Sequence, residues 1–207
     1  DLVEALDVVT IGYERQSKKL TPNELTTVAY HECGHALVGY VLQETVSPIK
    51  ISIIPRGVGA LGYTQPGSQE KVLLTKEELM GKVYCLVGGR IAEEVFMQSI
   101  TGGASDDLEK ATDLVKQMIC DYGMSATYGM MKIQLSKEYA VTASSNLKSK
   151  IESMVVEVIK SVCEEVRVMI KNHKQQIEKL KELLTERENL ETDDICSILG
   201  NIENTLQ

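Results

Sequence analysis

Two histidines and a glutamate within five residues are the clearest chemical feature of the sequence, because His31, Glu32 and His35 form the pattern HExxH. Each residue of an α-helix advances about 100°, so His31 and His35 share one face, one turn apart. Two imidazoles at this spacing can share one tetrahedral metal ion, and the glutamate beside them can reach a metal-bound water. Two of the chain's three histidines lie in this pattern, which favours a metal site over two histidines on a half-buried helix.

A zinc site that takes part in catalysis needs a third protein ligand and an open position. The extended metzincin pattern is absent, because Val38 and Val41 stand where its glycine and third histidine would be. His173 lies in a highly charged stretch, and Cys33 is about 200° around the helix from His31. A carboxylate remains, and the downstream candidates are Glu93, Glu94, Asp106, Asp107 and Glu109.

Strong start signals predict that the histidines lie on a helix. Thr21, Pro22 and Glu24 form a capping box with proline at the first helical position, so a helix is expected from about Pro22 to Leu42. A β-branched run predicts a strand at 49–54, followed by the turn 55–57 and a short strand at about 61–65. Proline and alternating polar residues favour a sheet edge for the strand 49–54.

Two more helices are expected to carry the candidate carboxylates. A second capping box at 75–78 predicts a helix that continues to about Met97. The turn 102–104 leads to Ser105 as the expected N-cap of a helix from about Asp106 to Tyr122, with Gly123 ending it.

The C-terminal part of the sequence is dominated by helical periodicity. Apolar residues recur every three or four positions from Leu147 to Ile170, a further helix holds Leu180 and Leu184, and a short one follows Thr192. The expected fold class is mainly α with a small β-sheet (α+β): an HExxH helix plus a C-terminal helical bundle.

Composition excludes several classes of protein. The formal net charge of the 207 residues is −8, and the basic residues are scattered, so a nucleic-acid binder is not expected. No apolar stretch is long enough to cross a bilayer, and the chain as given is expected to be soluble. The five cysteines are odd in number and widely spaced, which indicates reduced thiols.

Six motifs in order resemble the peptidase domain of FtsH-type AAA proteases, which are membrane-anchored, ATP-dependent zinc metalloproteases of bacteria, mitochondria and plastids. The first is His31-Glu32-Cys33-Gly34-His35-Ala36, and the others are Pro55-Arg56-Gly57, Leu61-Gly62-Tyr63, Gly88-Gly89-Arg90-Ile91-Ala92-Glu93-Glu94, Gly103-Ala104-Ser105-Asp106-Asp107-Leu108 and Tyr122-Gly123-Met124-Ser125. The resemblance covers residues 1–130 closely and the C-terminal helices by pattern only. Cys33 and Met97 depart from the family's usual alanine and glycine.

The resemblance implies a role for each site residue. One Zn²⁺ per chain would be held by His31, His35 and Asp107, with Glu32 as the catalytic base. Glu94 is a candidate for orienting a zinc-bound histidine, with a surface ion pair as the alternative. Asp106, in a position where the family usually has asparagine, is expected either beside a zinc ligand or in solvent.

The expected substrate is an unfolded or misassembled polypeptide, which would add as a strand to the sheet edge at Ile51, Ser52, Ile53 and Ile54. The resemblance also implies a homo- or hetero-hexamer of like subunits, anchored in the mitochondrial inner membrane, the plastid or the bacterial inner membrane by segments absent from this chain. The alternative is a non-catalytic helical module that holds such a ring together.

The expected domain division follows from the same resemblance. Residues 1–20 would be the end of an ATPase module and a linker, 21–142 the zinc peptidase core, and 143–207 a C-terminal helical region of the same domain. The sequence has no GxxxxGK[ST] phosphate-binding loop, so ATP and Mg²⁺ would bind only in the ATPase module, outside this chain.

Overall fold

The computed structural model describes residues 20–42, 48–55, 61–66, 73–133 and 145–200. Within them, helices dominate and three short strands form one sheet, so the expected mainly α fold with a small β-sheet is confirmed. None of the helices in this part of the chain combines the length and apolar character that a bilayer-spanning segment requires.

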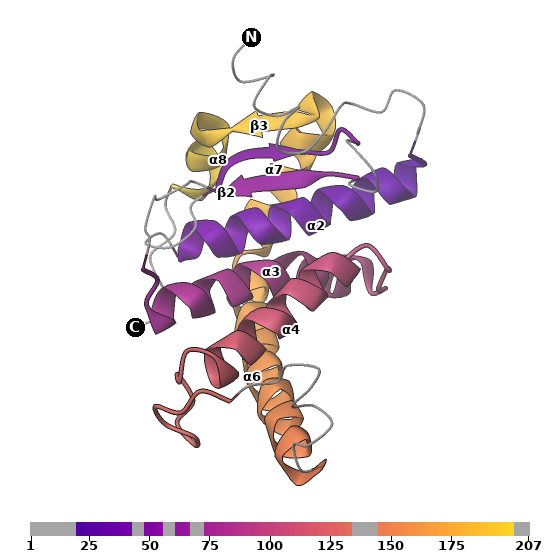
Figure 1. The fold of residues 1–207 in the computed structure, drawn as a ribbon. Coiled ribbons are helices and arrows are strands. Elements are labelled where there is room, and N and C mark those ends of the chain that lie inside the picture. The colour runs from indigo at the N-terminus through magenta and orange to yellow at the C-terminus, as the bar shows by residue number, and fades with distance from the viewer. Residues whose placement is uncertain (1–19, 43–47, 56–60, 67–72, 134–144, 201–207) are drawn as a thin grey trace.

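The HExxH helix is α2, Pro22–Val41, and it lies between the sheet and helix α3, Lys76–Met97 (Figure 1). Both predicted capping boxes form: Thr21 and Glu24 cap α2, whereas Thr75 and Glu78 cap α3. These two helices therefore begin where their local sequences require.

Helices α2 and α3 cross in close contact because each carries a glycine at the crossing point. A Cβ on Gly34 would lie 2.5 Å from the carbonyl oxygen of Gly88, and a Cβ on Gly88 would lie 2.9 Å from the carbonyl oxygen of Gly34. Only glycine permits this backbone approach. It brings the backbone of α3 against the helix face that carries the histidines.

The sheet corrects one prediction. Its strand order is β2-β1-β3, with β1 at Pro48–Ser52, β2 at Tyr63–Pro66 and β3 at Asn189–Glu191. Ile51 pairs with Thr64 on one side and with Leu190 on the other, and both pairings are antiparallel.

The sheet edge predicted at Ile51, Ser52, Ile53 and Ile54 is therefore wrong. Ile51 and Ser52 lie in the central strand, and the Ile53 N–H donates to the carbonyl oxygen of Glu188. Pro55, the proline that suggested an edge, lies beyond the end of β1, where it interrupts no central pairing.

Helix α4, Ser105–Cys120, packs against α3 and also departs from the prediction at its ends. Ser105 is the first helical residue rather than the N-cap, which is Ala104 and makes no side-chain cap hydrogen bond. The helix ends two residues earlier than expected, and Gly123 takes the left-handed conformation with φ of 63° in the turn beyond it.

The C-terminal elements pack on helices α2, α3 and α4. Helix α6, Ser145–Asn172, lies against α3 and α4, and helix α7, Lys174–Arg187, lies against α2. Helix α8, Thr192–Leu199, follows β3 directly and is capped by Glu191. Fully buried aliphatic side chains from all these segments join one core, among them Leu37, Ile51, Ile170, Leu180, Leu190 and Leu199.

Candidate metal centre and active site

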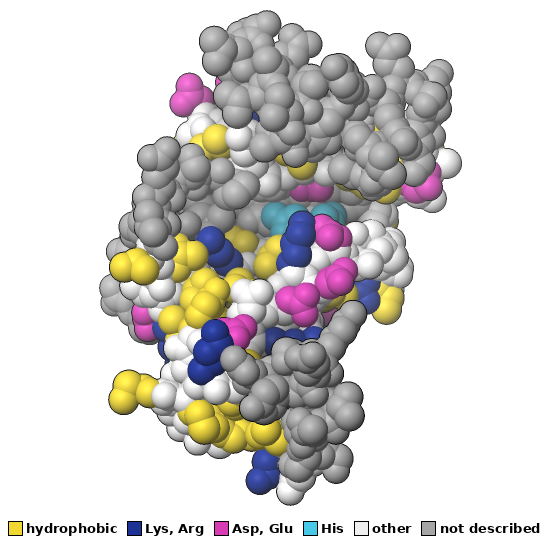
Figure 2. Space-filling model, viewed as in Figure 1, with side chains coloured by type: hydrophobic (Ala, Val, Ile, Leu, Met, Phe, Trp, Pro, Cys, Tyr) yellow, Lys and Arg dark blue, Asp and Glu magenta, His cyan; other side chains and the backbone are white. Residues whose placement is uncertain are grey.

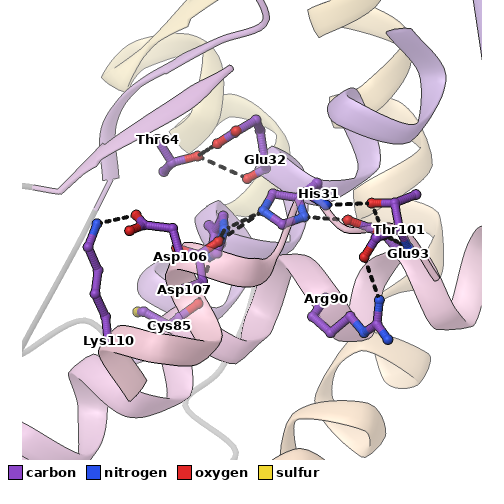
Figure 3. A network of polar contacts seen from close by, with 12 residues as sticks. His31, Glu32, Thr64, Cys85, Arg90, Glu93, Thr101, Asp106, Asp107 and Lys110 are labelled. Carbon is purple, nitrogen blue, oxygen red and sulfur yellow. Dashed lines mark hydrogen bonds and ion pairs between the residues drawn. The ribbon is translucent and has the colours of Figure 1, made fainter. Parts of the chain in front are cut away.

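Three side chains from two helices converge on one point in the structure (Figure 3). His31 Nε2 and His35 Nε2, both from α2, are 2.9 Å apart. Asp107 Oδ2, from the first turn of α4, lies 3.2 Å from His31 Nε2 and 3.4 Å from His35 Nε2. Ligand atoms on a tetrahedral zinc ion are about 3.3 Å apart when each bond is about 2.0–2.1 Å, so this triangle has the right size.

The second nitrogen of each imidazole has an acceptor beside it. His31 Nδ1 lies 2.6 Å from Glu93 Oε1, and His35 Nδ1 lies 2.7 Å from the carbonyl oxygen of Cys85. In a neutral ring the Nδ1 atom therefore carries the proton, and the lone pair of Nε2 points to the shared centre. Two such lone pairs and a carboxylate oxygen repel one another unless a cation lies among them, so the donors fit Zn²⁺.

The ionisation of the ligands reflects their mutual contact. Burial alone would lower the pKa of His31, but its hydrogen bonds to Asp107 and Glu93 raise that pKa to about 10. Burial alone would raise the pKa of Asp107, but its contacts with His31 and His35 bring that pKa well below its usual range. These three side chains thus stabilise a positive charge between them. A divalent metal ion and a proton compete for that position.

Glu32 lies beside the ligands but makes different contacts. Its side chain is buried, and Oε2 accepts a 2.8 Å hydrogen bond from Thr64 Oγ1 on β2. Burial raises the pKa of Glu32, although both histidines oppose this rise. A Cβ on Gly62 would lie 2.9 Å from Glu32 Oε1, so the residue before β2 packs directly against the carboxylate.

A wide cleft opens over these groups. Its walls come from α2, the start of β2, α3 and α4, and its volume is about 1580 Å³. Figure 2 shows histidine side chains in a hollow of this face, with acidic side chains beside them. The cleft is larger than the pockets that enclose most small ligands, so it has room for a polypeptide segment.

Two predicted accessory residues lie elsewhere. Glu94 does not reach a histidine: its carboxylate pairs with Arg167 Nε and Nη2 at 3.0 and 3.1 Å. Glu94 lies about 100° further around α3 than Glu93, and this rotation directs its side chain toward α6. The side chain of Asp106 lies in solvent, the second of its two expected places: it is 73% exposed and pairs with Lys110 at 2.6 Å.

Sequence reasoning missed the groups that hold the three candidate ligands in place. The sequence indicates Glu93 only as a candidate third ligand, yet Glu93 contacts the far nitrogen of His31. No motif in the sequence singles out Thr64 or Thr101, which donate to Glu32 and Glu93 respectively. Gly89 allows α3 to approach the histidines, because a Cβ there would lie 2.6 Å from both Nε2 atoms. One signal in the sequence could have identified this face of α3: Gly89 and Glu93 are four residues apart and therefore share one side of the helix.

Comparison with known proteins places the chain in a peptidase family. The model of peptidase family M41 matches residues 18–198. The ATP-dependent zinc metalloprotease FtsH of Rhodothermus marinus is 38% identical over 206 residues, which cover 97% of this chain and 30% of that protein. The protein of the same name from Pseudothermotoga lettingae is 40% identical over 212 residues, covering 96% of this chain and 33% of that protein.

A plant protein is similar to the same extent. The mitochondrial ATP-dependent zinc metalloprotease FTSH 3 of Oryza sativa is 37% identical over 203 residues, which cover 95% of this chain and 25% of that protein. The chain thus spans about a third or less of the length of these relatives. The resemblance to FtsH-type peptidase domains is confirmed: the chain belongs to peptidase family M41.

Proposed function

We propose that His31, His35 and Asp107 hold one zinc ion and that Glu32 acts as the base in peptide-bond hydrolysis. The observation that supports this most strongly is the convergence of three ligand atoms within 3.4 Å, next to a buried carboxylate in the same cleft. A bound zinc ion supplies a Lewis acid that acidifies water and polarises the peptide carbonyl.

The contacts of Glu32 suit a group that accepts and then returns a proton. Its Oε2 accepts a hydrogen bond from the Thr64 hydroxyl. Its other oxygen, Oε1, takes no part in that hydrogen bond. The carboxylate takes a proton from the attacking water and delivers it to the nitrogen of the departing amine. Since Thr64 belongs to β2, this strand orients the base as well as lining the cleft.

We further propose that the substrate main chain adds to β2 rather than to the central strand β1. Strand β2 is an outer strand of the described sheet, and Leu61, Gly62, Tyr63 and Thr64 line the cleft. Main-chain hydrogen bonds to a strand give affinity without demanding a particular sequence. This mode of binding suits unfolded or misassembled polypeptide substrates.

The longer protein is proposed to be a membrane-anchored, ATP-dependent protease that assembles as a hexamer. The support is the family membership together with the names of the relatives, which are ATP-dependent zinc metalloproteases several times longer than the chain. ATP and Mg²⁺ would then act outside this chain. The division at residues 20 and 142 remains a prediction, with both boundaries at or beside residues outside the described ranges.

The test of the proposed function is Glu32→Gln in the full-length protein with ATP and Mg²⁺ present. Glutamine keeps the shape and can still accept from Thr64, but it cannot take up a proton. We expect zinc content to be unchanged and turnover of an unfolded polypeptide to fall by about 10²- to 10⁴-fold. Equal turnover with zinc bound in both proteins would contradict the mechanism and favour the alternative, a non-catalytic assembly module.

The matched control is Glu94→Gln. This makes the same chemical change on the neighbouring helix, at a side chain that pairs with Arg167 near the surface. Exposed ion pairs contribute little to stability, so zinc content and turnover should both stay close to those of the unmodified protein.

A further inference from the structure

Glu93 is a buried carboxylate that connects the two segments carrying the metal ligands. Its exposed fraction is 1%, and its two oxygens face different partners. Oε1 lies 2.6 Å from His31 Nδ1 on α2. Oε2 accepts hydrogen bonds from both the N–H and the hydroxyl of Thr101, at 3.1 and 3.0 Å. Thr101 belongs to the connection between α3 and α4, which leads to Asp107 six residues later (Figure 3).

Thr101 is itself held from two further directions. Its hydroxyl oxygen accepts from the N–H of Gly103 at 3.2 Å, and its carbonyl oxygen accepts from Arg90 Nη1 at 3.1 Å. The Thr101 hydroxyl thus donates to Glu93 while it accepts from the turn that begins α4. One side chain joins the carboxylate behind His31 to the segment that presents Asp107.

The physical consequence concerns the orientation of His31. A carboxylate that bonded only to the imidazole could rotate about its last torsion, and the ring would follow. Two donors on Oε2 remove that freedom, so Oε1 stays aligned with Nδ1 and the Nε2 lone pair stays directed at the metal position. Burial also makes any unsatisfied carboxylate oxygen costly, which is why the second oxygen of Glu93 needs these donors.

We infer that the Thr101 hydroxyl is a positioning group for the metal centre, which acts through Glu93 on His31 and through the following turn on Asp107. The inference rests on the proposed function, in which His31 and Asp107 hold zinc. The competing explanation is that the hydroxyl only closes the local turn with Gly103, in which case it would affect the connection but not the metal.

The experiment compares Thr101→Val, which has the same shape without the hydroxyl, with Thr101→Ser, which keeps it. Thr101 is exposed, so neither change creates a core cavity. Zinc affinity is measured in the full-length protein by competition with a chelator, and Co²⁺ replaces zinc for the visible absorption spectrum. We expect Thr101→Val to bind zinc about tenfold more weakly and to alter the Co²⁺ spectrum, with Thr101→Ser close to the unmodified protein.

The control and the double variant separate the two explanations. Thr112→Val removes a hydroxyl that, within the described residues, donates to the Leu108 carbonyl in α4, and it should leave zinc affinity unchanged. In a Glu93→Gln background, the added change Thr101→Val should cost less than it does alone, because the carboxylate through which it acts is gone. If the fold-losses of zinc affinity in Thr101→Val and Glu93→Gln simply multiply in the double variant, the hydroxyl acts independently of Glu93 and the inference is overturned.

Two other outcomes also decide the matter. Zinc affinity and Co²⁺ spectrum of Thr101→Val equal to those of the unmodified protein would leave only the turn-closing role. An equal loss in Thr101→Ser and Thr101→Val would show that the methyl group or the turn matters rather than the hydroxyl. Failure of the proposed function itself gives a different result, namely zinc affinity that does not depend on His31, His35 or Asp107 in the unmodified background.

Discussion

Asp106 and Asp107 are adjacent residues of one type in very different surroundings. Asp107 is partly enclosed and lies within 3.4 Å of both histidine Nε2 atoms. Asp106 lies largely in solvent beside Lys110. A rotation of about 100° per residue in the first turn of α4 produces this difference. At the scale of single residues, position on the helix therefore separates the proposed ligand from a surface group.

The first prediction concerns this pair. Asp107→Ala should lose zinc, because a catalytic zinc site with only two protein ligands is incomplete. Asp106→Ala, the matched control, should keep zinc at the unmodified affinity, since it removes only an exposed ion pair. Metal content of the purified proteins checks both. Retention of zinc by Asp107→Ala would exclude Asp107 from the site.

At the scale of elements, the crossing of α2 and α3 sets the depth of the histidines. The crossing depends on Gly34 and Gly88, where backbone meets backbone without side chains between. It also places the carbonyl oxygen of Cys85 at His35 and the carboxylate of Glu93 at His31. The same crossing thus brings a hydrogen-bond acceptor to each imidazole.

The second prediction tests that crossing. Gly34→Ala would gain about 1 kcal/mol of helix propensity, but its Cβ would lie 2.5 Å from a backbone oxygen that cannot move alone. Overpacking costs about 1–3 kcal/mol, so we expect net destabilisation together with weaker zinc binding as the helices separate. Chemical denaturation and metal titration measure the two effects.

Gly102→Ala is the control for the second prediction, because a Cβ at Gly102 meets no atom within 4 Å. It should leave both stability and zinc affinity nearly unchanged. A Gly34→Ala protein as stable as this control would mean that the helix crossing can adjust without cost.

At the scale of the whole molecule, the proposed metal links parts of the chain that are distant in sequence. His35 and Asp107 are 72 positions apart, and the helices that carry them each pack on α3 and α6. Binding of an ion to the folded form alone stabilises that form, because the unfolded chain lacks the assembled site.

The third prediction is that a chelator lowers the thermal unfolding temperature. Zinc at about 100 times its dissociation constant stabilises by about 2.7 kcal/mol, which corresponds to about 5–10 °C in a chain of this size. Scanning calorimetry with zinc and with chelator measures the difference. Asp107→Ala should show no difference between the two conditions, and the same shift in that variant would place the stabilising zinc elsewhere.

The fourth prediction is that the chain self-associates. The C-terminal helices that the sequence pattern assigns to packing and assembly are present, and large apolar side chains such as Tyr122, Met130 and Val168 are exposed in the described part. Light scattering over a concentration series checks this, and the proposed assembly would appear as a hexamer. A strictly monomeric chain at high concentration would show that regions outside it drive assembly.

The sequence by itself determined the features that depend on local geometry. HExxH places two imidazoles on one face because the helix period is the same wherever the helix lies. Both capping boxes predicted the starts of α2 and α3 correctly, because caps are formed by residues three positions apart. Five carboxylates remained as candidates for the third ligand by this reasoning, and family resemblance selected Asp107 among them.

Only the tertiary structure decided which groups meet across the chain. It places Glu93 rather than Glu94 against His31, because the packing of α3 on α2 selects which of two adjacent faces is buried. It makes β1 a central strand, because β3 pairs with it from about 140 positions away. These outcomes depend on contacts between distant segments, and no local pattern of residues encodes which distant partner will arrive.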